Sequence, residues 1–182
     1  MSASKKKPQF DVLVDAHARE IYSYLWRMLQ DEQDAEDCLQ DAFLKAYLAY
    51  DRLDGTANYR AWLYRIAGNT ARTCLRGRLR TGVLLTENIA DPGLPVEQQA
   101  QNRHRLGAVR NAIEALPYKQ RESLILRKYQ GLTYEEVGSI LDTSAEGARA
   151  NVYQGLRKLR LQFEDGESLS VPNMAEENSE VG

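Results

Sequence analysis

The sequence predicts an all-α protein built from two small helical domains joined by a flexible linker. Apolar residues recur at helical spacing over most of the chain, and no segment shows the sustained alternation of β-branched residues that is typical of strands. Residues 81–103 interrupt this pattern with glycines and prolines. A connection of that length is unusual inside one compact domain, so we divide the chain into two domains.

The first domain is expected to span residues 10–80, and its first two helices are predicted over 10–29 and 32–53. Both segments carry an apolar stripe at the spacing of an amphipathic helix. Asp31 is a candidate N-cap for the second helix, and the acidic residues that follow it suit the positive end of the helix dipole. Gly55 is expected to end that helix.

The third helix is predicted over residues 59–80, with Asn58 as its cap. Helical geometry places its apolar and basic residues on opposite faces. The basic face carries Arg65, Asn69, Arg72, Arg76 and Arg80, with Trp62 at its edge and Tyr59 and Tyr64 close by. Basic residues neutralise phosphates and aromatic rings stack on unpaired bases, which favours a site for single-stranded nucleic acid. A solvated arginine face is the alternative, but the adjoining loop of residues 54–58 is small enough to take a flipped base.

The second helix has an acidic and partly apolar outward face. It is expected to carry Asp34, Asp37, Gln40, Asp41, Leu44, Lys45 and Leu48. DNA would be repelled by this face, whereas a protein partner with a basic and partly apolar surface would fit it. A solvated helix without a partner is the alternative.

The second domain is expected to span residues 104–163 and to end in a helix-turn-helix. Thr133 and Glu136 form a T-x-x-E capping box at the start of a helix over 134–141. Ser144 is a candidate cap for the final helix. A short helix, a tight turn and a longer helix are typical of the motif that inserts its second helix into the major groove.

Several residues of the final helix are expected to face DNA. Arg149 suits guanine and Asn151 suits adenine, whereas Arg157 and the basic residues after it suit phosphates. The outward set is Glu146, Arg149, Ala150, Asn151, Tyr153, Gln154 and Arg157. A plain helical hairpin with a solvated face is the alternative, which the two consecutive caps and the short first helix disfavour.

The net charge of −2 conceals an uneven distribution. Residues 164–182 hold six acidic residues and no basic one, so the rest of the chain is positively charged. An acidic protein can therefore still bind DNA, because the local charge is what matters. We expect this tail to be disordered, and we hypothesise that it screens the basic second domain.

The ends and the composition also limit the location and the chemistry of the protein. Residues 1–9 form a lysine-containing extension with no apolar stretch behind it, and no apolar run approaches membrane-spanning length, so a cytoplasmic protein is predicted. We find no glycine-rich phosphate loop, no nucleophile pair and no metal-ligand spacing, so we expect no enzymatic activity, cofactor or metal. Cys38 and Cys74 are expected to be reduced core residues, and His17 to be packed or partly exposed.

Three segments, in this order, resemble the extracytoplasmic function (ECF) sigma factors of bacterial RNA polymerase. Residues 34–55, DAEDCLQDAFLKAYLAYDRLDG, resemble sigma region 2.2. Residues 59–80, which contain WLYRIAGN, resemble regions 2.3 and 2.4, and residues 116–160 resemble region 4. Each motif alone is modest evidence, but the ordered set is highly specific.

The resemblance implies a transcription initiation subunit that binds core RNA polymerase and promoter DNA. Contacts to the polymerase would involve the β′ clamp helices and the β flap, with Asp34, Asp37, Gln40, Asp41, Phe43 and Leu44 as candidates on the region 2.2-like helix. Melting of the −10 element and capture of a flipped base would involve Asp54, Gly55, Thr56, Ala57, Asn58, Trp62, Arg65, Asn69, Arg72 and Arg76. The −35 element would be read by Thr133 and the outward set of the final helix, given above.

The resemblance also implies a role for the linker and a regulatory partner. Glu87, Asp91 and Glu97 would imitate RNA near the polymerase active site. Many family members are held inactive by an anti-sigma factor, and we expect one here. Asn151 and Gln154 stand where basic residues are common in the family, which predicts weaker attraction to phosphates.

Two other functions fit parts of the pattern. One is a self-standing helix-turn-helix repressor or activator whose first domain dimerises or senses a signal. The sequence shows no apolar seam for such a dimer, and this function does not explain the acidic second helix. The other is a sigma-like decoy that binds a regulatory protein and no DNA, which leaves the basic stripe with Trp62 without a use.

Overall fold

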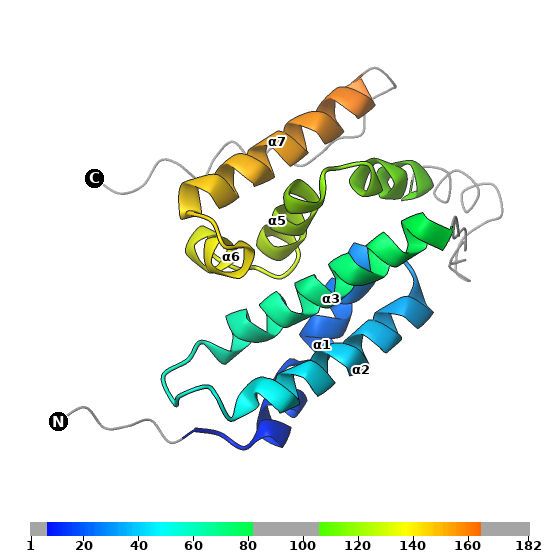
Figure 1. Ribbon diagram of the computed structural model, residues 1–182. Helices are drawn as coiled ribbons and strands as arrows, with labels where there is room; N and C mark the ends of the chain where they lie inside the picture. Colours follow the sequence, from blue (N-terminus) through cyan, green and yellow to red (C-terminus); the bar gives the residue numbers. More distant parts are fainter. Residues whose placement is uncertain (1–6, 82–105, 165–182) are drawn as a thin grey trace, which may run out of the picture.

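The computed structural model describes residues 7–81 and 106–164, and all of its regular structure is helical (Figure 1). The first lobe comprises α1 (Phe10–Leu29), α2 (Glu32–Tyr50) and α3 (Tyr59–Thr81). The second lobe comprises helical residues 106–114, α5 (Tyr118–Lys128), α6 (Tyr134–Leu141) and α7 (Ala145–Glu164). These two helical groups confirm the predicted fold class. The N-terminal residues 1–6, the linker acids and the acidic tail after Glu164 lie outside the described residues.

The two ends of α2 show how local chemistry sets a helix boundary. Asp31 accepts a hydrogen bond from the backbone N–H of Asp34 at 2.7 Å, which confirms the predicted N-cap. At the other end the helix stops at Tyr50, three residues earlier than predicted. The chain tightens there, because the N–H groups of residues 52 and 53 bond to carbonyls only three residues back. The Tyr50 hydroxyl also donates to the Pro8 carbonyl, and Lys7 Nζ donates to the Tyr50 carbonyl at 2.6 Å.

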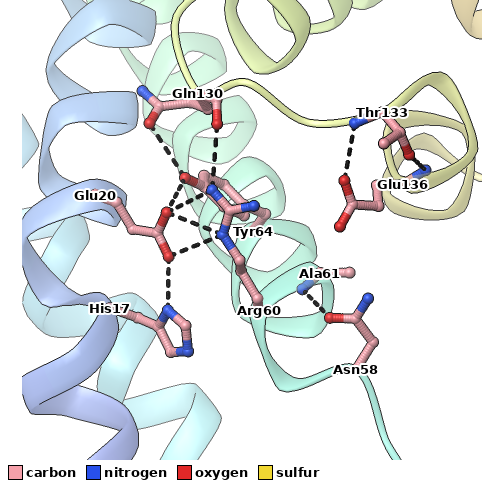
Figure 2. Close-up of polar contacts among 9 residues, drawn as sticks. All are labelled: His17, Glu20, Asn58, Arg60, Ala61, Tyr64, Gln130, Thr133 and Glu136. Carbon is pink, nitrogen blue, oxygen red and sulfur yellow. Dashed lines mark hydrogen bonds and ion pairs between the residues drawn. The ribbon is translucent and has the colours of Figure 1, made fainter.

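α3 begins at a side-chain cap and runs slightly beyond its predicted end. Asn58 Oδ1 accepts from the Ala61 N–H at 3.0 Å, which confirms the cap (Figure 2). Thr81, which the sequence places in the linker, is the last residue of the helix, because nothing before Gly82 breaks the helical pattern. The helix is therefore a continuous rod of 23 residues.

The core of the first lobe combines large side chains from α1 with small ones from α2 and α3. α1 contributes Ile21, Tyr24, Leu25 and Met28, each at most 1% exposed. The facing helices contribute Ala35, Ala42, Ala46, Ala67 and Ala71. Alanines let the helix backbones approach closely, while each large side chain contributes roughly 1.5–3 kcal/mol by leaving water.

The helix-turn-helix has the caps and the core that the sequence predicts. Figure 1 shows α6 nearly end-on and α7 lengthwise, so the two helices cross steeply. Thr133 and Glu136 form the reciprocal capping box, and Ser144 Oγ accepts from the Gly147 N–H at 3.0 Å. The apolar residues between the two helices, Val137, Ile140, Leu141, Ala148 and Val152, are all buried.

The turn between α6 and α7 depends on a close approach at Gly138. Asp142 adopts a left-handed conformation with φ 55°, and the Thr143 N–H bonds back to the Gly138 carbonyl at 2.9 Å. A Cβ added to Gly138 would lie 2.8 Å from the Thr143 carbonyl oxygen. Only glycine therefore lets the turn pass this close to α6.

The two lobes pack directly against each other. One continuous apolar cluster joins residues of α1, α2 and α3 to Ile125, Leu126, Leu132 and Val137 of the second lobe. α1 contacts α5, and α3 contacts α6. The sequence indicates two domains but gives no sign that they share a core.

A polar network centred on Glu20 crosses this junction (Figure 2). The Arg60 guanidinium donates to both carboxylate oxygens of Glu20 at 2.7–3.1 Å, and the Tyr64 hydroxyl donates to Glu20 at 3.0 Å. Arg60 also donates to the Gln130 carbonyl at 3.2 Å. Burial acts to raise the pKa of Glu20, but hydrogen bonds from Arg60 and His17 outweigh it, and the pKa is lowered.

We predict that Glu20→Ala lowers the free energy of unfolding at pH 7 by about 1–3 kcal/mol, because it leaves Arg60 and Tyr64 without their shared acceptor. The lowered pKa means that Glu20 stabilises the fold above its ordinary pKa of 4.5 and loses this effect as the pH falls through the lowered value. The difference from wild type should therefore shrink in acid. Urea unfolding at several pH values measures it.

Asp15→Ala, an exposed position on the same helix, is the matched control and should change stability little. Equal stability of Glu20→Ala and wild type at pH 7 would contradict the role of this network.

Candidate nucleic-acid interface

α3 presents the basic face that the sequence predicts. Arg65, Asn69 and Arg76 are exposed, and Ala67, Thr70 and Ala71 on the opposite side are buried. Arg72 differs, because it is only partly exposed and reaches toward the second lobe. Arg80 is exposed as well, so the face has four residues open to solvent and one engaged inside the protein.

The aromatic residues near the start of α3 are more deeply packed than predicted. Tyr64 is fully buried and its hydroxyl bonds to Glu20, so the expectation that it stacks on a base is wrong. Trp62 and Tyr59 remain partly exposed, with ring centres 6.4 Å and 6.0 Å from the buried Tyr50 ring. These two rings remain available to bases at one end of the basic face.

The loop of residues 54–58 is a pre-organised turn beside those rings. Asp54 Oδ1 accepts from the Thr56 N–H at 2.8 Å and from its hydroxyl at 2.6 Å. The Tyr59 hydroxyl donates to the Asp54 carbonyl at 2.8 Å. Hydrogen bonds from the side chain and then the backbone of Thr56 lower the pKa of Asp54. Asp54, Thr56 and Asn58 are exposed, and Gly55 and Ala57 are partly exposed.

The outward face of α7 agrees closely with the predicted base-reading set. Glu146, Arg149, Ala150, Tyr153, Gln154 and Arg157 are exposed, and Asn151 is partly exposed. The Arg149 guanidinium lies 5.1 Å from the Tyr134 ring centre, a cation–π distance. Gln154 accepts a hydrogen bond from Gln120 at 2.8 Å. Thr133 is exposed but its side chain is used by the capping box.

α2 exposes an apolar patch next to acidic residues. Leu44, Tyr47 and Leu48 are 58%, 62% and 70% exposed. Asp37 and Gln40 are exposed on the same helix, and Asp41 forms an ion pair with Lys45 at 2.6 Å. Exposed leucines flanked by acids are typical of a protein-binding surface.

Two of the predicted polymerase contacts on α2 are turned inward. Asp34, expected on the outward face, forms an ion pair with Arg78 of α3 and accepts from the Cys74 thiol at 3.4 Å. Phe43 is partly buried, with its ring centre 6.4 Å from that of Phe10. Helical periodicity places Asp34 near the edge of the face, and the arginine on the neighbouring helix draws it inward.

The cysteines have packing roles. Cys38 is buried and Cys74 partly buried, and both are free thiols. Burial raises the pKa of Cys38 to about 12, so the thiol stays protonated at neutral pH. In the two described ranges, no group of three or more His, Cys, Asp or Glu side chains could hold a metal ion. Among the helices of these ranges, none has the length and apolar character needed to cross a membrane.

Sequence reasoning missed the residues that join the two lobes. Glu122 of α5 is buried and accepts from the Tyr24 hydroxyl at 2.7 Å, with Arg72 at 3.4 Å. Tyr118 donates to the Gly68 carbonyl at 2.8 Å. In the sequence Glu122 stands three and four residues before Ile125 and Leu126, and a charged residue on the same helix face as apolar ones is a signal that could have marked this position.

Two family descriptions match the lobes just described. Residues 13–81 match Sigma-70 region 2, and residues 106–159 match Sigma-70, region 4. The boundaries follow α1 to α3 in one case and the helices of the second lobe in the other. The chain is therefore a sigma-70 family protein with a region 2 domain and a region 4 domain.

Individual relatives narrow this assignment. The RNA polymerase sigma-H factor of Pseudomonas aeruginosa is 31% identical over 159 residues, which cover 81% of this chain and 82% of the relative. The ECF RNA polymerase sigma-E factor of Escherichia coli K12 is 31% identical over 156 residues, which cover 80% of this chain and 81% of the relative. The chain belongs to the ECF RNA polymerase sigma factors. Proteins of this family are initiation factors and not enzymes.

Solved structures agree with the fold. The sigma factor RpoE of Bartonella quintana, in complex with the anti-sigma factor NepR, matches with a TM-score of 0.66 at 21% identity, covering 87% of this chain and 98% of that one. CnrH in complex with the cytosolic domain of CnrY matches with a TM-score of 0.65 at 22% identity, covering 87% and 89%. At these identities the likeness supports the fold alone.

We predict that Gly138→Ala weakens duplex DNA binding by the second lobe, because the new methyl group would push the Thr143 backbone away from α6. Overpacking of this kind costs about 1–3 kcal/mol, which corresponds to roughly 5- to 150-fold in the population of the correct turn. Thermal unfolding measures the loss of stability, and a duplex-binding assay measures the loss of DNA affinity. Gly107→Ala, with nothing within 4 Å, is the matched control and should preserve both. Unchanged binding by Gly138→Ala would contradict the role of the close approach.

Proposed function

We propose that this sigma factor binds core RNA polymerase through α2 and directs it to promoters by reading a −10 element with α3 and a −35 element with α7. The observation that carries the proposal is that one chain presents three surfaces of different chemistry on three helices. α2 is acidic and apolar, α3 is basic and aromatic, and α7 exposes polar base-reading residues.

The α2 surface supports docking on the β′ clamp helices of the polymerase. Leu44 and Leu48 would lose their exposed apolar area to the partner, which provides binding energy. Asp37, Gln40 and Asp41 would supply charge complementarity to a basic surface. Asp34 and Phe43 act from behind this face, because each is partly buried inside the lobe. The β flap remains the expected contact of the second lobe.

The end of α3 near the 54–58 loop supports melting of the −10 element. Trp62 and Tyr59 offer ring faces, and Asn58 and Thr56 border them on the loop. Arg65, Asn69, Arg72 and Arg76 continue along the helix and can hold the phosphates of the opened strand. Capture of unstacked bases would drive strand separation without any covalent step.

α7 supports recognition of the −35 element in the major groove. Arg149 is held near Tyr134 and can make a bidentate contact to guanine, while Asn151 can contact adenine. Arg157 and Lys158 lie two turns further along, where they are better placed for phosphates.

A groove between the lobes supports control by an anti-sigma factor. It has a volume of about 400 Å³ and is bordered by Arg72, Arg76, Lys119 and Arg121, with Leu75 and Leu79 as apolar walls. Basic walls around an apolar strip fit an acidic amphipathic helix of a partner. Two structural neighbours were solved with regulatory partners, NepR and the cytosolic domain of CnrY.

In-vitro transcription with purified core polymerase on a library of genomic fragments tests the proposed function. The chain should start RNA synthesis at a set of sites that share two motifs. A self-standing repressor or activator would instead protect a near-palindromic operator without polymerase, and a decoy would do neither. Failure to associate with core polymerase, or association without initiation at any site, would exclude the proposal.

We predict that Asp37→Arg combined with Leu44→Ser reduces affinity for core polymerase at least tenfold, because it removes a charge contact and an apolar contact from one exposed face. Pull-down and transcription assays measure the loss. Asp15→Arg on α1 makes the same charge change outside this face and should have little effect. Equal losses of affinity for the Asp37→Arg, Leu44→Ser double variant and for Asp15→Arg would place the docking surface elsewhere.

We predict that Arg149→Ala relaxes specificity at one base pair of the −35 element, at a cost of about 1–3 kcal/mol. Binding to a series of single-base promoter variants measures this. Arg157→Ala should instead weaken binding to all variants alike and reduce its salt dependence. A uniform loss for Arg149→Ala would make this residue a phosphate contact.

A further inference from the structure

A buried carboxylate lies where the two lobes meet. The side chain of Glu122, on α5, is 2% exposed. Its partners come from the other lobe: the Tyr24 hydroxyl of α1 at 2.7 Å and the Arg72 guanidinium of α3 at 3.4 Å. Both groups that contact the carboxylate directly thus belong to the first lobe, while Glu122 itself lies among the buried residues of α5.

The carboxylate fits because α3 has a glycine opposite it. A Cβ added to Gly68 would lie 2.3 Å from Glu122 Oε1 and 2.9 Å from the Tyr24 hydroxyl oxygen. Gly68 lies in the interior of a long helix, where glycine is less favourable than alanine. The helix itself gains nothing from glycine, so the residue serves the close approach of α5.

The contact between α3 and the second lobe also involves the basic face of α3. Arg72 is bound to Glu122 and stacks at 4.6 Å from the Tyr118 ring centre. Arg65 lies 3.7 Å from Asp142 in the turn of the helix-turn-helix. α6 also contacts α3. In the closed arrangement both arginines are therefore paired with acidic groups of the second lobe, Arg72 in a partly buried contact and Arg65 in an exposed one.

We propose that Glu122, seated against Gly68, is an autoinhibitory latch that holds the lobes of the free protein closed and covers part of the DNA-binding face of α3. The inference rests on the proposed function in treating α3 as that face. Opening of the lobes frees Arg65 and Arg72 together, so binding to polymerase and exposure of the strand-capturing surface become one event.

The chemistry of the latch makes it weak enough to open. A buried carboxylate loses the favourable free energy of its hydration. In Glu122 this loss is offset by one hydrogen bond from the Tyr24 hydroxyl and one long contact to the Arg72 guanidinium. Burial raises its pKa, opposed by the hydrogen bond from Tyr24 and the charges of Arg72 and Arg121. At pH values between the ordinary carboxyl pKa and the raised one, Glu122 therefore binds a proton when the lobes close. Acid should favour the closed form, and this effect is lost as the pH rises through the raised pKa.

The experiment compares two glycine-to-alanine substitutions on the same helix. Gly68→Ala displaces the Glu122 carboxylate, whereas Gly77→Ala meets nothing within 4 Å. Both changes replace glycine by the better helix former, so a difference between them reports the close contacts of Gly68 with Glu122 and the Tyr24 hydroxyl. Small-angle scattering of the free protein measures lobe opening. Fluorescence anisotropy with a single-stranded −10 oligonucleotide measures access to α3.

Gly68→Ala should increase the radius of gyration without lowering the helix content. If the open form makes up roughly a tenth of the wild-type protein, the oligonucleotide should bind about tenfold more tightly. Gly68→Leu should match or exceed this effect, and Gly77→Ala should behave as wild type. In a Glu122→Ala background, Gly68→Ala should open the lobes less than it does in wild type, because the carboxylate it displaces is gone and only the contact with the Tyr24 hydroxyl remains.

Different results overturn different parts of the inference. An unchanged radius of gyration in both Gly68 variants would exclude the latch. Opening with unchanged oligonucleotide affinity would exclude its inhibitory role. If wild type and variants all fail to initiate transcription with core polymerase, the proposed function fails, whereas the scattering result for the latch stands by itself.

Discussion

The structure depends on the position of α3 between two sets of neighbours. One side of this helix packs on α1 and α2 through alanines, and another side meets α5 and α6 of the second lobe. The rest of its surface carries arginines. A single rod therefore sets the shape of the first lobe, the docking of the second and the placement of the basic residues. A change in how α3 packs would alter all three.

The contact between the lobes is polar at its edges and apolar at its centre. Apolar packing between α1, α3, α5 and α6 holds the lobes together but does not fix their relative orientation, because the hydrophobic effect is not directional. Polar contacts fix the orientation, because the buried Glu122 must meet Tyr24 and Arg72 of the first lobe, and Arg60 donates to the Gln130 carbonyl of the second. Small rotations of one lobe would leave the Glu122 carboxylate unpaired. Buried charges thus select one closed arrangement from the many that apolar surfaces alone would allow.

The sequence predicts the elements of the fold well because each one has a local cause. Asp31, Asn58, Thr133 and Ser144 cap their helices as predicted, since a cap needs only its own first turn. Exposure along α7 follows from helical spacing and also agrees. The base-stacking role of Tyr64 fails for the opposite reason. Its burial depends on Glu20 of α1, far along the chain, and no local pattern records that contact.

The same distinction explains what could not be predicted about the site. Periodicity places Arg72 and Asp34 on outward faces, and the structure draws both inward through partners 50 and 44 residues away. Lobe closure itself arises across a connection that carries no periodic signal. Such long-range contacts depend on how whole faces fit together, which a single sequence does not display.

The anchoring of Lys7 and Pro8 to Tyr50 has a practical consequence for anyone labelling this molecule. These contacts fix the leading segment at the carboxyl end of α2, the helix with the exposed leucines. A bulky reporter fused ahead of Lys7 would project from the rim of that surface and could shield it from a large assembly. Fusions placed beyond α7 leave the molecule from the other lobe, so two-hybrid or pull-down reporters are better attached there.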